Sequence, residues 1–175
     1  MKRASILLAV GMGSALMTSA GLAAKKTASD KQAQAKEASK AVGTEVVINL
    51  STKGNDIAFD SEAIQVPFGR DFPLIFKNRA KTDSEIIHNI AILKPGSTDV
   101  VLEYFEEHDY DMDLMRKHPA VLAMTPQLEP GQTGTLQLGP KLLSKPGLYP
   151  YICLVPGHAD MLGMKGVMSV IEKKK

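Results

Sequence analysis

The sequence predicts an all-β domain, either an antiparallel β-sandwich or a barrel, with a short helical insertion. Three observations support this prediction: apolar residues recur at every second position, turn signals with Gly or Pro separate these runs, and one segment has helical periodicity instead. The alternating runs span residues 46–50, 72–76, 86–92, 136–138, 149–153 and 167–171. The turn signals lie at residues 53–56, 67–69, 94–96, 129–131 and 145–147. Each run would place alternate side chains on one face of a strand.

The helical periodicity covers residues 98–117. Apolar side chains recur there at helical spacing beneath an acidic face, namely Val101, Tyr104, Phe105, Met112 and Met115. Either Ser97 or Thr98 is available as the N-cap residue. We therefore expect one or two helices inserted between strands.

The N-terminus has the pattern of a secretory signal, with Lys2 and Arg3 before an apolar run and a stretch of small residues. The apolar run is about a dozen residues long, shorter than the roughly 20 that span a bilayer, and no later run reaches that length. We expect residues 1–24 to be a signal peptide, residues 25–43 to be a Lys- and Ala-rich flexible linker, and residues 44–173 to be the folded domain. The mature protein would lie in the periplasm without an integral membrane segment.

Charge is divided between the ends and the body of the chain. Residues 25–43 hold five lysines against two acidic residues, whereas residues 41–172 have an excess of six acidic residues. There is no basic stripe interleaved with aromatic residues, so nucleic acid is not an expected partner. Residues 99–113 carry seven carboxylates. Such a run is usually a solvated face, and electrostatic steering of a basic partner is the alternative.

Cys153 is the single cysteine of the chain, although exported proteins usually pair their cysteines in disulfides. A buried packing role is the ordinary explanation of a lone cysteine. The residues after it favour metal ligation instead: His158 follows a Pro156–Gly157 turn, and Met164 precedes the next alternating run. A thiolate with two imidazoles and a weak axial thioether is the environment of blue copper, whereas zinc more often recruits further cysteines or carboxylates.

The second imidazole is assigned to His88, which shares one face of its predicted strand with Ile90 and Ile92. A histidine on an apolar face is more often a hydrogen-bonded core residue than a metal ligand. The ligand pattern after Cys153 makes metal ligation the favoured interpretation of His88. The predicted metal site is therefore His88, Cys153, His158 and Met164. His108 and His118, in and after the acidic segment, are assigned no role.

At these residues the sequence resembles the cupredoxins, most closely their azurin and auracyanin branch. The matching positions run through most of the domain: 54–56, 59, 63–66, 88–89, 151, 153, 156–158 and 164–166. The resemblance implies a Greek-key antiparallel β-sandwich, the cupredoxin fold, with one type 1 copper ion that cycles between Cu(II) and Cu(I). It also implies that Asn89 ties the two ligand-bearing segments together by hydrogen bonds near the thiolate.

Three features depart from that family pattern. Five residues separate His158 from Met164, more than in azurins or auracyanins, which makes Met161 the alternative axial ligand. Met164 is preferred because it leads into the final strand as it does in azurin. A single cysteine rules out the azurin disulfide. Ile87 stands where azurin has a glycine whose carbonyl approaches copper, so that weak contact is not expected.

Four protein ligands would leave no open position for a substrate, so we expect a carrier of single electrons and not an enzyme. It would be a monomer whose redox partners, such as a c-type cytochrome, an oxidase or a reductase, dock on apolar residues around His158. Two alternatives stay open. One is a periplasmic copper carrier or store that uses Met112, Met115, Met124 and Met168. The other is an enzyme with Cys153 as nucleophile, activated by His158 or His88.

Overall fold

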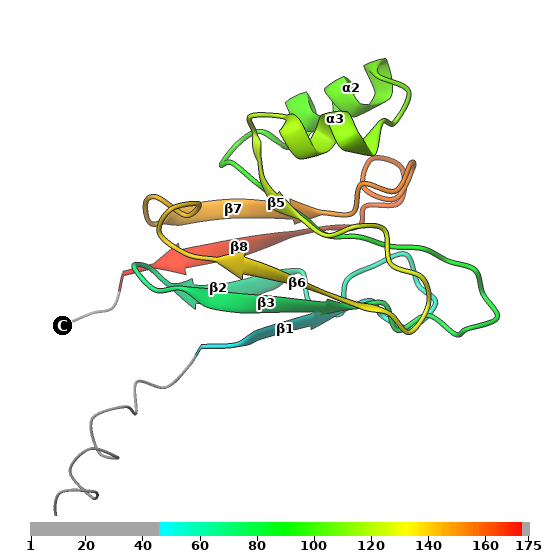
Figure 1. Cartoon of the computed structure of the whole chain (residues 1–175), viewed down its shortest axis with the longest axis horizontal. Helices are drawn as coiled ribbons and strands as arrows, with labels where there is room; N and C mark the ends of the chain where they lie inside the picture. Colours follow the sequence, from blue (N-terminus) through cyan, green and yellow to red (C-terminus); the bar gives the residue numbers. More distant parts are fainter. Residues whose placement is uncertain (1–45, 173–175) are drawn as a thin grey trace, which may run out of the picture. The chain divides into compact units, whose positions relative to one another are not determined.

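The structure, a computed structural model, describes residues 46–172, and two β-sheets form the framework of this segment (Figure 1). The strands are β1 (Ile48–Ser51), β2 (Ala63–Pro67), β3 (Phe72–Lys77), β4 (Ala91–Leu93), β5 (Val121–Met124), β6 (Thr133–Leu138), β7 (Gly147–Ile152) and β8 (Lys165–Ile171). The helices are α2 (Thr98–Glu107) and α3 (Met112–Lys117). The expected signal peptide and linker lie outside the described residues, and the domain bounds at 44 and 173 stay predictions.

The strand order is β1-β3-β6 in one sheet and β2-β8-β7-β4-β5 in the other. The two sheets are separate, which confirms the predicted sandwich and excludes the barrel. Four of the six strand pairings are antiparallel, but β1 runs parallel to β3 and β2 runs parallel to β8. These parallel pairs differ from the wholly antiparallel expectation. They arise because the chain changes sheets between β1, β2 and β3, and hydrophobic alternation does not specify the direction of a neighbouring strand.

The main core lies between the sheets, and inward residues of the predicted strands supply much of it. Its largest fully buried side chains include Phe72, Leu74, Phe76, Tyr149 and Tyr151. In β8 the predicted set, residues 167, 169 and 171, faces outward: Val167 is 36% exposed and Ile171 is 42% exposed. Met168 and Val170 supply the buried face instead.

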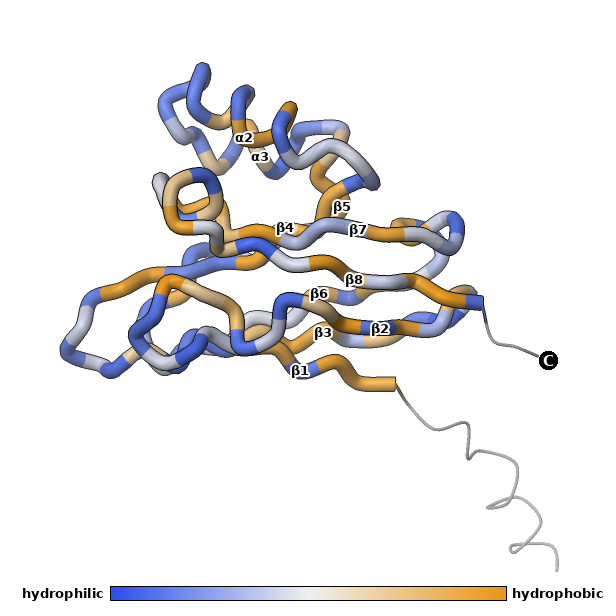
Figure 2. Tube along the Cα trace, turned by 180° about the vertical axis from the view of Figure 1, so that it is seen from behind, coloured by the Kyte–Doolittle hydropathy of each residue, from blue (hydrophilic) through white to orange (hydrophobic). Residues whose placement is uncertain are grey.

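A second apolar cluster joins the helices to the outer side of the five-stranded sheet. It contains Ala91, Leu93, Val101, Phe105, Met115, Ile152, Leu154 and Ala159. The predicted helical insertion is therefore confirmed as two short helices, which lie over β5 and β7 in Figure 1. Figure 2 shows the contrast between this largely hydrophilic pair and the apolar strands beneath it. Neither of the described helices has the length and apolar content that a membrane crossing requires.

Local sequence explains where the two helices begin. Ser97 is the N-cap residue of α2, although its hydroxyl donates to the carbonyl of Lys94 and accepts no hydrogen bond from the helix backbone. Asp111 caps α3, where its carboxylate accepts hydrogen bonds from the backbone N–H groups of Asp113 and Leu114. A carboxylate in this position satisfies backbone donors that the first helical turn leaves free.

Candidate metal centre

Cys153 directly follows β7 and is completely buried. Its side chain belongs to the main core, whereas Ile152 and Leu154 on either side of it belong to the cluster beneath the helices. Burial raises the pKa of Cys153 to about 11, and hydrogen bonds from the backbone of Asn89 and Val155 oppose that rise. In the metal-free protein the thiol therefore holds its proton near neutral pH, and a bound metal would displace it.

His88 lies where a loop meets the segment around Leu128. The His88 N–H donates to the carbonyl of Leu128 at 3.1 Å, and the Leu128 N–H donates back to the carbonyl of His88 at 2.7 Å. The predicted strand over residues 86–92 is shorter than expected, because β4 begins at Ala91. The inward direction of His88 is nevertheless confirmed, since His88, Ile90 and Ile92 are all fully buried.

Burial also controls the charge of the two imidazoles. It lowers the pKa of His88 to about 4, with a smaller contribution from the neighbouring His158. Burial lowers the pKa of His158 as well, while Asp160 acts in the opposite direction. Both rings are therefore neutral near pH 7, which is the form that binds a metal.

His158 is held by the ligand loop, which we define as residues 153–164. The His158 N–H donates to the carbonyl of Val155 at 3.0 Å, and Gly157 between them adopts a φ of +81°, which favours glycine. The Met164 N–H donates to the carbonyl of His158 at 2.8 Å, and the Cys153 N–H donates to the carbonyl of Met164 at 3.2 Å. These bonds close the loop and fix His158 beside Cys153.

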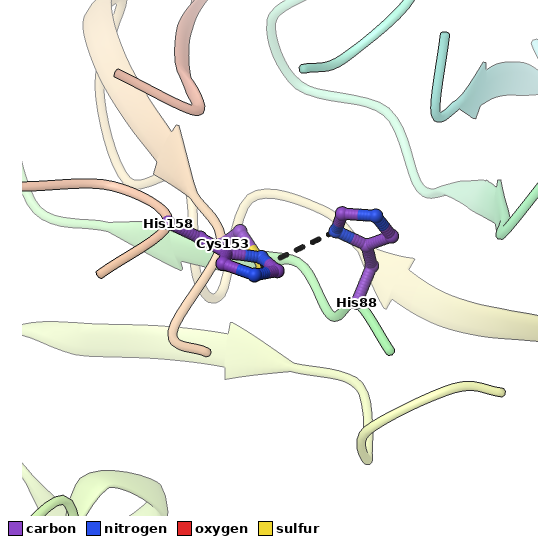
Figure 3. A group of neighbouring side chains, drawn as sticks. All are labelled: His88, Cys153 and His158. Atoms are coloured by element: carbon purple, nitrogen blue, oxygen red, sulfur yellow. Dashed lines mark hydrogen bonds between the residues drawn. The ribbon is translucent and has the colours of Figure 1, made fainter. Parts of the chain in front are cut away.

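The three side chains converge on one point (Figure 3). The Cys153 Sγ lies 3.5 Å from Nδ1 of His158 and 3.9 Å from Nδ1 of His88. One donor atom from each residue lies within 4.8 Å of the others. Ligand atoms about 2.0 and 2.3 Å from a metal in a trigonal plane would be about 3.7 Å apart. The observed separations therefore fit a single small metal ion.

Asn89 joins the two segments that supply these donors. Its backbone N–H points to Cys153 Sγ at 3.5 Å, and its side-chain Oδ1 accepts a hydrogen bond from the Leu154 N–H at 2.6 Å. Asn89 is completely buried. These are the contacts that the resemblance implies, and an N–H directed at the sulfur favours its thiolate form.

The two candidate axial ligands differ in burial. Met164 is 1% exposed and belongs to the same core cluster as Cys153, whereas Met161 is 81% exposed. Met164 is also hydrogen-bonded through its backbone to both Cys153 and His158. This burial favours Met164, and its ligation of the metal stays a prediction.

Two polar residues near His88 were missed by sequence reasoning. Thr125 accepts a hydrogen bond from the Ile90 N–H through its hydroxyl at 3.2 Å, and Asn78 donates to main-chain carbonyls beside His88. A polar residue at a strand end carries no sequence signal for such a role. His108 stacks on Tyr104 with a ring-centroid distance of 3.8 Å, and the His118 ring is tilted against Tyr104 at 4.7 Å. Neither histidine belongs to the cluster of donors.

The fold is a two-sheet sandwich, and its site places a buried thiol between two neutral imidazoles. Fold and site together define a class of protein that binds a single metal ion, with a donor set compatible with type 1 copper. The sequence supports the same class independently, because residues 46–171 match the copper binding proteins of the plastocyanin/azurin family. The chain belongs to this family.

Solved structures agree with this assignment. A dithionite-reduced auracyanin from Roseiflexus castenholzii is 30% identical, with 74% of this chain and 99% of that chain covered and a TM-score of 0.57. Auracyanin A from Chloroflexus aurantiacus is 26% identical, with coverage of 73% and 99% and a TM-score of 0.55. An azurin from Methylomonas sp. strain J shares the fold at 22% identity, with coverage of 72% and 98% and a TM-score of 0.57. No curated protein sequence matches this chain.

Proposed function

We propose that this protein is an exported, periplasmic carrier of single electrons. In this proposal His88, Cys153 and His158 hold one type 1 copper ion, and Met164 is the axial ligand. The observation that carries the proposal is the convergence of two Nδ1 atoms on a buried sulfur, at 3.5 and 3.9 Å. Members of the family typically transfer electrons, and when bound, copper supplies the change between Cu(II) and Cu(I).

The protein contributes a rigid, dry ligand cage. Backbone hydrogen bonds within the ligand loop and from Asn89 hold the donors in place, so little rearrangement is needed when the charge of the centre changes. His88 and Cys153 are fully buried, and His158 is 8% exposed. Among the three donors, His158 therefore provides the shortest connection to solvent and the expected exit for the electron.

The surface beside His158 suits a transient partner. Met161 is 81% exposed, Leu162 is 57% exposed and Pro156 is exposed as well. We call these three residues the apolar patch. A small apolar patch of this kind favours brief docking, which redox encounters require.

The acidic helices border this patch. Glu106 and Tyr110 line the same small cavity, of about 10 Å³, as Pro156 and Gly157. A partner with a basic rim, such as a c-type cytochrome, would meet both the apolar patch and the carboxylates of α2 and α3. Charge reversal at Glu103 and Glu106 should slow association at low salt and have little effect at high salt. If the charge-reversed variant and the wild-type protein associated with the partner at the same rate at low salt, the proposed steering would be contradicted.

Absorption spectroscopy after addition of Cu(II) tests the centre itself. The wild-type protein should gain an intense visible thiolate-to-copper charge-transfer band, and Cys153→Ser should abolish it. Met164→Leu should shift the band, whereas the matched change Met161→Leu should leave it in place. A folded, copper-loaded wild type without this band would refute the type 1 assignment.

No observation on the described residues favours either alternative function, the copper carrier or store or the enzyme with Cys153 as nucleophile. Met115 and Met168 are fully buried in the two cores, and Met112 and Met124 pack against the cluster beneath the helices, which gives these methionines a packing role. The raised pKa of Cys153 is the opposite of what a nucleophilic thiolate requires.

A further inference from the structure

Asn78 is a completely buried amide that directly follows β3. Its Nδ2 donates one hydrogen bond to the carbonyl of Ile86 at 2.8 Å and another to the carbonyl of Leu128 at 2.9 Å. Its Oδ1 accepts a hydrogen bond from the Ala80 N–H at 3.0 Å. Both amide hydrogens and the amide oxygen are therefore used, and this network fixes the orientation of the side chain.

The two carbonyls that Asn78 binds belong to the segments that place His88. Leu128 lies directly opposite His88 and exchanges two backbone hydrogen bonds with it. Ile86 precedes His88 by two residues. The Leu128 carbonyl accepts from both the His88 N–H and the Asn78 amide. One side chain thus links the approach to His88 with the segment across from it.

The approach to His88 has few other restraints. Residues 78–87 contain no strand, and Glu85 adopts a φ of +55°, which costs energy for a residue with a side chain. The N–H of Ile86 reaches only the hydroxyl of Ser84, at a distance of 3.5 Å. The short bond from Asn78 to the Ile86 carbonyl is therefore the stronger restraint on this residue.

We propose that Asn78 is a positioning residue for the metal centre. Its amide clamps Ile86 to Leu128 and thereby sets the position of the His88 imidazole relative to the Cys153 sulfur. The copper part of this inference rests on the proposed function, because the ligand geometry is what Asn78 would tune. The clamp itself is a property of the metal-free chain.

Asn78→Ala is the test, and Thr52→Val is its matched control. The Thr52 hydroxyl is also buried and accepts a hydrogen bond from the Arg79 N–H at 2.8 Å. Its removal costs this buried bond and the long contact, 3.5 Å, from the Thr52 hydroxyl to Oδ1 of Asn78. It leaves both Nδ2 bonds of Asn78, which form the proposed clamp, intact. Any effect of lower stability alone should appear in both variants.

Two measurements separate positioning from general stability. In the metal-free proteins, Asn78→Ala should raise the amide hydrogen-exchange rates of His88 and Leu128 about tenfold, as loss of one restraining bond predicts. In the copper-loaded proteins, Asn78→Ala should shift the charge-transfer band and the reduction potential. Thr52→Val should change neither set of values. If Asn78→Ala does not fold, Asn78→Ser is measured instead, because it retains a single donor.

The outcomes distinguish this inference from the proposed function. A wild-type protein without the charge-transfer band would refute the proposed copper centre, and the exchange rates would still decide whether the clamp exists. A normal wild-type band with the same band and potential in Asn78→Ala would overturn the positioning role. Equal shifts in Asn78→Ala and Thr52→Val would also overturn it, since they would reflect stability alone.

Discussion

Replacement of Gly166 by Ala should destabilise the domain through one side chain, Tyr151. Gly166 lies opposite Tyr151 in the β7–β8 pairing. A Cβ atom at Gly166 would lie nearer than 3.0 Å to Cζ, Cε2 and the hydroxyl oxygen of Tyr151. The ring has little room to move, because its hydroxyl donates to the carbonyl of Ser61 at 2.6 Å and Phe59 packs on it edge to face.

The expected cost follows from these contacts. Overpacking a well-packed core costs about 1–3 kcal/mol, and weakening the Tyr151 hydrogen bond adds roughly 1 kcal/mol. We therefore expect the free energy of unfolding to fall by about 2–4 kcal/mol, or Tm to fall by roughly 10 °C in a domain of this size. Gly166 is not among the glycines with positive φ. Without the clash, Gly→Ala would instead stabilise the protein by about 0.4–1 kcal/mol.

Urea unfolding of the metal-free protein measures this difference, and a double-mutant cycle identifies its cause. Gly166→Ala should be far less costly in a Tyr151→Leu background, where the ring is absent. In copper-loaded protein the single change should also shift the charge-transfer band, because Tyr151 precedes Cys153 by two residues on the same face. A stable Gly166→Ala variant, or equal costs in both backgrounds, would refute the reasoning.

Three further predictions address the metal centre and the second core. Asn89→Ala leaves the Leu154 N–H buried without its partner, so urea unfolding should show a loss of about 1–3 kcal/mol; unchanged stability would argue against this bond. Burial holds the pKa of His88 in the folded protein at about 4, below the ordinary histidine value of 6.5. The unfolded chain therefore binds protons more readily between these values, and metal-free stability should fall as the pH is lowered from 6.5 to 4. His88→Gln should weaken that dependence, and identical pH profiles would contradict it. Met115→Leu should cost less than about 1.5 kcal/mol and leave the copper stoichiometry at one, as determined by metal analysis; a lost second ion would favour the copper-carrier alternative.

The three side chains that converge in the structure, His88, Cys153 and His158, could be predicted to do so because their signals are local. Cys153 and His158 lie within one short loop, and His88 lies on an alternating run in which Ile90 and Ile92 are buried. The helical insertion was predictable for the same reason, since its periodicity is contained in one segment. Local periodicity is a direct consequence of which side chains must leave water.

Features that depend on distant partners were not predictable in this way. The bond from Asn78 to Leu128 joins residues 50 positions apart, and the parallel pairing of β1 with β3 depends on how the chain crosses between sheets. In β8 both faces carry apolar residues, so alternation alone does not select Met168 and Val170 as the buried ones. The packing of the whole domain determines this hydrogen bond, this strand pairing and the buried face of β8, and no single segment specifies them.

The distance along the chain between His88 and Cys153 has a consequence for durability. The two residues are 65 positions apart, and a chain with one cysteine cannot join such segments by a disulfide. A copper ion held by both would act as a cross-link, and closing a loop of this length removes about 4 kcal/mol of unfolded-chain entropy in the simplest treatment. Under the proposed assignment, resistance to heat and to proteases would rise and fall with the supply of copper.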